Sequence, residues 1–167
     1  MTADPLTSAS ATTAWVVTLN KPFYPLYVWW VAGSGVWTSM FTWVALPAFA
    51  ALPYVARRWP IAARAGLPLA GMADTALSTE LFGQNSGVEA FFVPCAALAS
   101  LSFTAAEAWT SRALVALVFV VFVAMHLAAP AGLYPWPPSE VAALSKLNLL
   151  SAASLTAFVG LRFASAR

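Results

Sequence analysis

Long apolar runs separated by short polar interruptions most constrain what this chain can fold into. The first run extends from about Tyr24 to Ala56 and ends at the sequence Arg57-Arg58-Trp59-Pro60. Soluble domains carry about 25% charged residues, whereas only 8% of this chain is charged and 61% is hydrophobic. The pattern therefore predicts an all-α fold, a polytopic transmembrane helical bundle.

Five apolar runs predict about five membrane spans, since one span needs about 20 residues. The runs cover residues 24–56, 61–82, 88–106, 112–129 and 141–164. Residues 24–56 are interpreted as one long, tilted helix, which Pro47 and Pro53 would kink.

Six spans are the alternative. The segment Gly33-Ser34-Gly35 could break the first run into a hairpin, with an additional helix formed by residues 10–32. Lys21 would then lie in the middle of the membrane, which argues against the hairpin.

The first 20 residues differ in composition from the rest of the chain. Residues 1–20 are rich in Thr, Ser and Ala, and no basic residue precedes their short apolar patch, which excludes a secretory signal. They are interpreted as a flexible N-terminal arm, and residues 21–167 as a single transmembrane helical domain.

Basic residues predict the orientation, because they collect at cytoplasmic ends. Five spans with the N-terminus outside and the C-terminus in the cytoplasm leave only Lys21 and Lys146 outside. The expected location is the cell inner (plasma) membrane, crossed several times by the chain. The basic residues on the cytoplasmic side are Arg57, Arg58, Arg64, Arg112, Arg162 and Arg167.

Polar residues between and within the apolar runs mark a candidate site in the outer half of the membrane. Asp74 stands in the middle of an apolar run, where a carboxylate needs a partner or a proton. Gly83, Ser86 and Gly87 belong to a polar turn that forms the expected rim. The candidate ligand-binding residues are Asp74, Glu80, Asn85, Glu89, His126 and Asn148.

Two interpretations of these polar residues stay open. They could form a pocket in which His126 responds to pH. They could instead satisfy one another and hold the helices in register, with Lys146 as an ion-pair candidate for Glu80 or Glu89.

Catalytic and cofactor chemistry find little support. The sequence has no HExxH motif, no GxSxG motif and no glycine-rich phosphate loop followed by lysine. A single cysteine, Cys95, excludes an internal disulfide, and a single histidine excludes bis-histidine haem ligation, although one axial ligand stays possible. No catalytic residue, metal or cofactor is therefore expected, and a net charge of +2 does not indicate nucleic-acid binding.

One stretch points to a family. The sequence of residues 81–92, Leu-Phe-Gly-Gln-Asn-Ser-Gly-Val-Glu-Ala-Phe-Phe, together with Asn148 and Phe158, resembles the multi-helix membrane-anchor sensor regions that precede bacterial adenylate and diguanylate cyclases. In those regions a Gly-x-x-Ser-Gly turn leads into an aromatic helix. The resemblance implies a membrane sensor region. Because the sequence ends at Arg167, it also implies a sensor without its output domain.

The leading hypothesis is a non-enzymatic sensor or receptor-like module that binds a small ligand or responds to pH and signals to a partner chain. An accessory subunit of a larger membrane complex is the alternative, and a membrane enzyme or transporter using buried carboxylates is the third. The expected partners are the lipid bilayer and a second protein chain or a second copy, with a small-molecule ligand possible.

Overall fold

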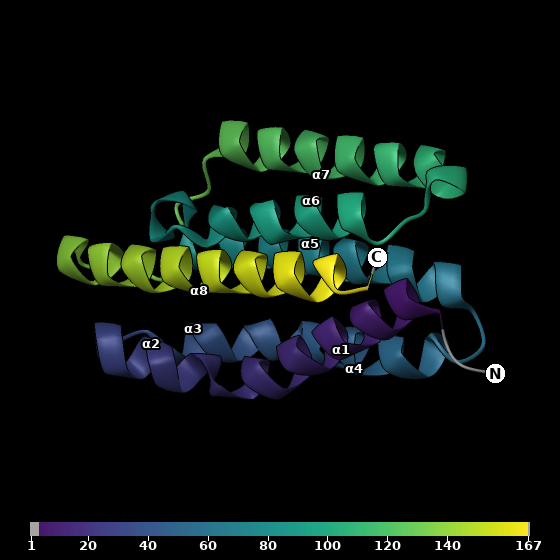
Figure 1. Ribbon diagram of the computed structural model, residues 1–167. Coiled ribbons are helices and arrows are strands. Elements are labelled where there is room, and N and C mark those ends of the chain that lie inside the picture. Colours follow the sequence, from purple (N-terminus) through teal and green to yellow (C-terminus); the bar gives the residue numbers. More distant parts are fainter. Residues whose placement is uncertain (1–3, 167) are drawn as a thin grey trace.

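The computed structural model describes residues 4–166, which form six helical segments and no strand. The segments run back and forth along one bundle (Figure 1), so the predicted all-α transmembrane bundle is confirmed. In chain order they are α1 (Pro5–Asn20) with η1 (Lys21–Phe23) and α2 (Tyr24–Ala32); α3 (Val36–Met40) with η2 (Phe41–Ala45) and α4 (Leu46–Val55); α5 (Pro60–Phe82); η4 (Val88–Phe91) with α6 (Phe92–Leu101); η5 (Ala105–Glu107) with α7 (Ala108–Ala128); and α8 (Pro138–Ala164). A further short turn, η3 (Gln84–Ser86), follows α5.

Three segments are long and apolar enough to cross a bilayer, namely Val36–Val55, Ala105–Ala128 and Pro138–Ala164. The other three are interrupted by charge or are shorter. The first carries Lys21 at its centre, α5 carries Asp74 and two further charged residues, and Val88–Leu101 is a shorter apolar helix.

The first apolar run is a hairpin rather than one long helix. Gly33 and Gly35 adopt positive φ angles of 78° and 59°, which residues other than glycine rarely adopt. The chain reverses direction between them. The preferred interpretation of residues 24–56 as a single helix is therefore wrong, and the described chain forms six helical segments, as the hairpin alternative predicted. Lys21 does lie within the bundle, where Asp74 binds it.

The N-terminal stretch is part of the bundle. Asp4 caps α1 by accepting hydrogen bonds from the backbone N–H groups of Leu6 (3.0 Å) and Thr7 (3.1 Å). Leu6 and Ala14 are buried, and α1 packs against α4 and α5. The predicted flexible arm is therefore wrong for residues 5–20, while residues 1–3 lie outside the described chain.

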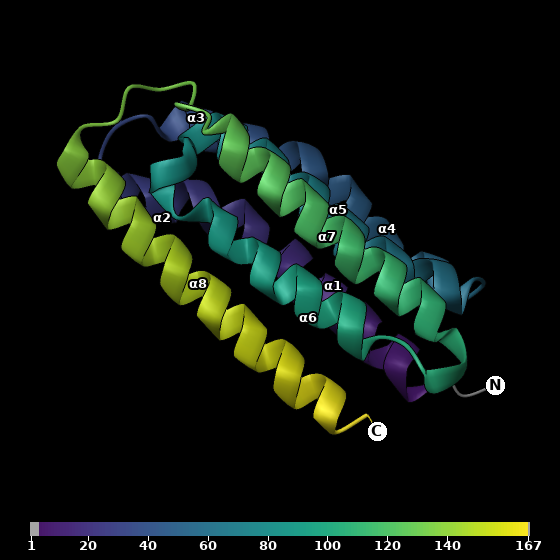
Figure 2. The same cartoon turned by 90° about the horizontal axis from the view of Figure 1, so that it is seen from above.

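Both described ends lie at the same end of the bundle, as Figures 1 and 2 show. Asp4 and Ala166 line one shared hollow there. The expectation that the two termini lie on opposite sides is therefore wrong. The α4–α5 connection with Arg57 and Arg58 lies at this end too, which we call the arginine end.

The opposite end is closed by the proline-rich loop of residues 130–137. This loop covers the end of α5, because Gln84 N–H donates to the Pro130 carbonyl and Leu133 N–H to the Leu81 carbonyl, both at 3.0 Å. Trp136 stacks on Phe82 with ring centroids 5.9 Å apart.

The hairpin turn and this loop contact each other at Gly35. A Cβ atom on Gly35 would lie 2.5 Å from Trp136 Cη2, whereas a Cβ on Gly33 would meet no atom within 4 Å. Tyr134 packs edge-on against Trp136 at a centroid distance of 4.8 Å, and its Cδ1 would lie 2.8 Å from the same Cβ, so neither ring can easily move aside.

We expect Gly35→Ala to lower the free energy of unfolding by about 2–4 kcal/mol, because it adds a steric clash to an unfavourable φ angle. Gly33→Ala is the matched control and should cost only the φ strain, about 1–2 kcal/mol. Denaturant titration in detergent, followed by circular dichroism, measures both. Equal losses would contradict the packing of Trp136 on the hairpin.

Candidate functional site

A buried ion pair joins the first and third helical segments. Lys21 Nζ lies 2.7 Å from both carboxylate oxygens of Asp74, and the two side chains are 8% and 18% exposed. An unpaired charge at this depth in an apolar bundle costs several kcal/mol, so each group makes the other tolerable.

Local sequence directs both side chains to this place. Pro22 and Pro25 lack the N–H groups that would continue the α-helical ladder, and the chain tightens to the 3-10 turn η1 at Lys21. On α5, Asp74 shares a helix face with Gly71 and Ser78, at spacings of three and four residues. This face points into the bundle, since Ser78 is buried.

The ion pair forms part of the wall of a cavity of about 160 Å³. The lining is mostly apolar and comes from five of the six helical segments. Lys21 and Asp74 are its only charged members among the described residues. The other lining residues include Val16, Val17, Asn20, Tyr24, Tyr27, Thr42, Phe49, Leu67, Gly71, Thr75, Ser78, Val88, Phe91, Pro94, Cys95, Leu98, Ser151 and Leu155.

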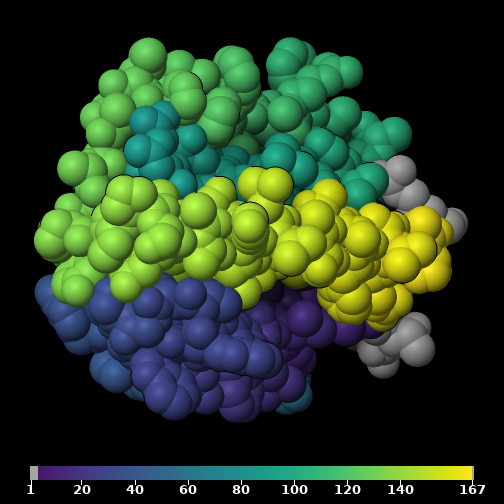
Figure 3. Space-filling model, turned by 90° about the vertical axis from the view of Figure 1, so that its left-hand side faces the viewer, coloured from purple at the N-terminus to yellow at the C-terminus, as the bar shows by residue number. Residues whose placement is uncertain are grey.

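The cavity opens on the side of the bundle, between α1 and α8. Val16 and Asn20 on α1 belong to its lining and are exposed, and Ser151 and Leu155 line it from α8. Figure 3 shows a recess between the purple N-terminal segment and yellow-green α8. The opening of the cavity therefore faces the side of the bundle rather than either of its ends (Figure 3).

Asn148 serves as a crosslink near this cavity. It is fully buried on α8, where its Oδ1 accepts a hydrogen bond from the Tyr24 hydroxyl and its Nδ2 donates to the Ser86 carbonyl, both at 2.9 Å. These bonds tie α2 and α8 to the turn after α5. Both ends of the amide are already engaged, which favours a structural role.

His126 sits at the closed end of the bundle, on the last turn of α7. Its Nδ1 lies 2.7 Å from Gln84 Nε2 and 3.2 Å from Glu89 Oε2, while Gln84 Nε2 also donates to the His126 carbonyl at 3.2 Å. His126 is exposed, whereas Glu89 is nearly buried. The three residues hold α7 to the turn between α5 and α6.

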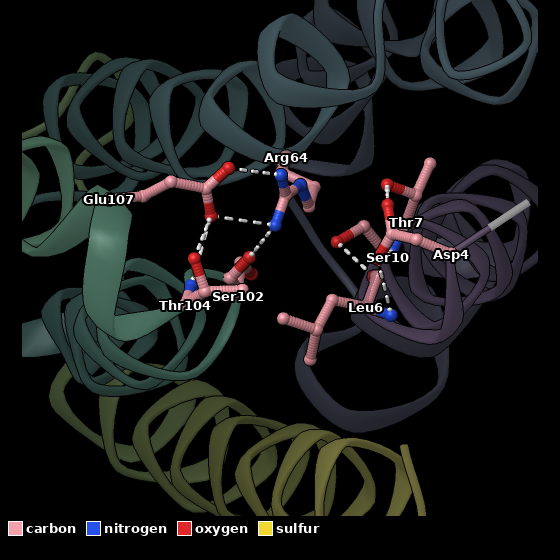
Figure 4. A network of polar contacts seen from close by, with 8 residues as sticks. All are labelled: Asp4, Leu6, Thr7, Ser10, Arg64, Ser102, Thr104 and Glu107. Atoms are coloured by element: carbon pink, nitrogen blue, oxygen red, sulfur yellow. Dashed lines mark hydrogen bonds and ion pairs between the residues drawn. The ribbon is translucent and has the colours of Figure 1, made fainter. Parts of the chain in front are cut away.

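A second ion pair lies at the arginine end (Figure 4). Arg64 Nη2 lies 2.5 Å from Glu107 Oε1, and Arg64 Nη1 donates to Glu107 Oε2 and to the Ser102 carbonyl, both at 3.0 Å. Thr104 and Glu107 form a capping box at the start of the α7 segment. The fork of Arg64 thus fixes α5 to the α6–α7 connection.

Asp4 lies near this ion pair. Burial by itself would raise the pKa of Asp4, but hydrogen bonds from Thr7 and Leu6 and the positive charge of Arg64 outweigh it, so its pKa is held below the usual range. Asp4 therefore stays ionised as the α1 cap down to more acidic pH than a free aspartate.

The predicted site residues do not form one pocket. Asp74 is in the cavity wall, Glu89 meets His126, and Asn148 is a buried crosslink. The remaining predicted members, Glu80, Asn85 and Lys146, are exposed. No ion pair joins Lys146 to either glutamate within residues 4–166.

Sequence reasoning missed Lys21, which it placed outside the membrane. The signal was present: Lys21 and Asp74 are opposite charges that each stand alone in apolar surroundings, 53 residues apart. Burying either charge alone would be costly, and burying the two as a pair removes most of that cost.

We expect Asp74→Leu to lower the free energy of unfolding by about 3–5 kcal/mol, because the Lys21 ammonium is left buried without a counter-charge. The double variant Lys21→Met/Asp74→Leu should recover most of that loss, since buried ion pairs can often be replaced by apolar groups of similar volume. Denaturant titration of both single variants and the double variant gives the coupling energy. Additive losses would show that the two groups act independently.

Comparison with known proteins gives one match. Residues 8–165 match the model of MASE7, a membrane-associated sensor domain family. No curated protein and no solved structure matches the chain. Since the match covers nearly all of the described chain, the protein belongs to the MASE7 family of membrane-associated sensor domains.

Proposed function

We propose that this sensor region takes a small ligand from the bilayer into the cavity between α1, α5, α6 and α8. The observation that carries the proposal is the Lys21–Asp74 pair in the cavity wall. Ionisable groups within membrane bundles mark functional sites by default. A mostly apolar cavity with a few polar groups is also the usual form of a small-molecule site.

Helix α8 is the proposed route of the signal. It lines the cavity with Ser151 and Leu155, and further along it buries Val159 and Phe163 in the same apolar cluster as Leu6 of α1. A ligand that separates α1 from α8 would therefore alter packing at the arginine end. The module itself is proposed to be non-enzymatic and to pass this change to a partner chain.

The arginine end is proposed to face the cytoplasm of a bacterial inner membrane. Arg57, Arg58, Arg64, Arg112 and Arg162 lie on the segments that meet there. Basic residues favour the cytoplasmic side. Both termini would then be cytoplasmic.

Native mass spectrometry of the protein, gently extracted from its own membrane, tests the ligand proposal. Cys95 lines the cavity and is the only cysteine, so its alkylation by N-ethylmaleimide reports occupancy. We expect a small-molecule adduct whose presence slows this alkylation. Ser151→Phe should abolish the adduct because it fills the cavity. Ser154→Phe, at an exposed position of α8 outside the cavity lining, should retain it.

Reproducible co-extraction of other membrane subunits without a small-molecule adduct would contradict the ligand proposal. That outcome would favour the accessory-subunit alternative. An adduct that persists unchanged in Ser151→Phe would place the ligand elsewhere on the protein.

A response to protonation is a second candidate function, favoured by the geometry at His126. The Nδ1 atom of neutral His126 can accept from Gln84 or donate to Glu89, but it cannot do both. Because the Gln84 amide also donates to the His126 carbonyl, its orientation makes Nδ1 the acceptor. Protonation of Nδ1 would break its bond with Gln84 and turn Nδ1 into a charged donor to Glu89. The contact that holds α7 would then change from Gln84 to Glu89.

The chain has one histidine, so histidine labelled at its ring nitrogens gives NMR signals from His126 alone. We expect the neutral ring to carry its proton on Nε2, with Nδ1 as acceptor. In Gln84→Leu the ring should switch to the Nδ1–H tautomer and donate to Glu89. An Nδ1–H tautomer in the unmodified protein would rule out the proposed exchange.

A further inference from the structure

The volume of the cavity limits the size of its ligand. About 160 Å³ is available. An engineered protein cavity of about 150 Å³ takes up benzene. The body of the ligand is therefore about the size of one six-membered ring, and its apolar faces would contact side chains such as Leu67, Phe91 and Leu98.

The charges in the lining determine the charge of the ligand. Lys21 and Asp74 neutralise each other, and no other charged side chain among residues 4–166 lines the cavity. A charged ligand would leave one charge without a partner in apolar surroundings, at a cost of several kcal/mol. A neutral ligand keeps the pair intact.

The hydrogen bonds around the pair leave an ionised acceptor with free capacity. Lys21 donates to both oxygens of Asp74, and its Nζ also lies over the Phe49 ring, 5.9 Å from the centroid. A carboxylate has about four lone-pair positions, and the two bonds from Lys21 occupy two of them. Asp74 is 18% exposed and lines the cavity, so it keeps acceptor capacity at the cavity wall.

The neighbouring threonine hydroxyls do not compete for this role as donors. Thr42 donates to the Ser39 carbonyl at 2.7 Å and Thr75 to the Gly71 carbonyl at 2.8 Å. A bond to an ionised acceptor is also stronger than one to a neutral oxygen. The most favourable polar contact in the cavity is thus a ligand O–H or N–H that donates to Asp74.

We propose that the ligand is a neutral, lipid-soluble molecule of single-ring size that carries a hydroxyl or amine donor, and that Asp74 accepts its hydrogen bond. This inference rests on the proposed function, because it names the ligand class of the same cavity. Phenols and small cyclic alcohols belong to this class. Carboxylates, quaternary amines and molecules with acceptors alone do not.

Three fluorinated probes test the donor requirement in the intact protein. Para-fluorophenol has the donor, para-fluorotoluene replaces the hydroxyl by a methyl group of similar size, and para-fluoroanisole keeps the oxygen as an acceptor only. Fluorine NMR measures the affinity of each probe, and protection of Cys95 from N-ethylmaleimide places the bound probe in the cavity. Ser151→Phe gives the background from partitioning into the detergent.

After this correction we expect para-fluorophenol to bind at least about tenfold more tightly than either other probe, since a hydrogen bond to a charged group contributes about 1.5–3 kcal/mol. In the double variant Lys21→Met/Asp74→Leu the three affinities should become equal within about twofold. This variant replaces the pair by apolar side chains and leaves no unpaired buried charge, so it avoids the main cause of unfolding in the single variants.

The failures are distinguishable. If all three probes protect Cys95 equally in the unmodified protein, or if para-fluoroanisole binds as well as para-fluorophenol, the donor inference is overturned while the cavity remains a ligand site. If no probe binds or protects Cys95, the cavity site and the inference fall together.

Discussion

The Lys21–Asp74 ion pair is the interaction on which the arrangement of this bundle depends. It fixes the first helical segment against α5 at a level where both side chains are largely buried. Without Asp74, the lysine of the first segment would be buried among apolar side chains with no counter-charge. The six-segment fold and the position of the cavity thus have the same origin, because the pair that holds α1 in place is also the polar part of the cavity wall.

The two ends of the bundle are closed by different physical means. At the arginine end, Arg64 and Glu107 form a charged fork that joins α5 to the α6–α7 connection. At the other end, backbone bonds and stacked rings join the loop of residues 130–137 to α5 and to the hairpin turn. Directional bonds to an ion pair tolerate less displacement than stacked rings. The wall of the cavity between these ends consists mainly of apolar side chains, which can repack around a ligand at lower cost.

The sequence predicted the parts of this fold that follow from local pattern. Apolar runs with few charges gave the helical membrane bundle, and the polar stretch after Phe82 was correctly placed as a turn between helices. The hairpin in the first apolar run was rejected because the cost of burying Lys21 was assessed for lysine alone. Periodicity within one segment carries no information on a partner 53 residues away. Residues 5–20 were misjudged for a related reason: their Ser and Thr side chains look polar in sequence, but Ser10 and Thr13 donate to carbonyls one turn back in α1.

The candidate site was predicted only in part. Asp74 was recognised because a carboxylate within an apolar run is exceptional, and the structure places it in the cavity wall. Glu89 and His126 do meet, as their positions at the same end of neighbouring helices allowed. Asn148 was recognised as a polar residue within an apolar run, yet its role depends on Tyr24 and on the Ser86 carbonyl, which no spacing rule connects. The cavity itself arises from how several helices pack, which a single sequence does not specify.

Helix α7 lies at one edge of the bundle, where it packs on α5 and α6, and contributes no residue to the cavity. Its outward side presents large apolar groups such as Phe119, Val120 and Leu127. Other segments also expose large apolar groups, such as Trp30 of α2 and Leu150 of α8, but those segments line the cavity as well. Substitutions on the outer side of α7 can therefore change what the protein lies next to, lipid or protein, without altering the lining of the cavity. The residues that line the cavity and the residues of α7 that contact neighbouring lipids or proteins can therefore change independently during evolution.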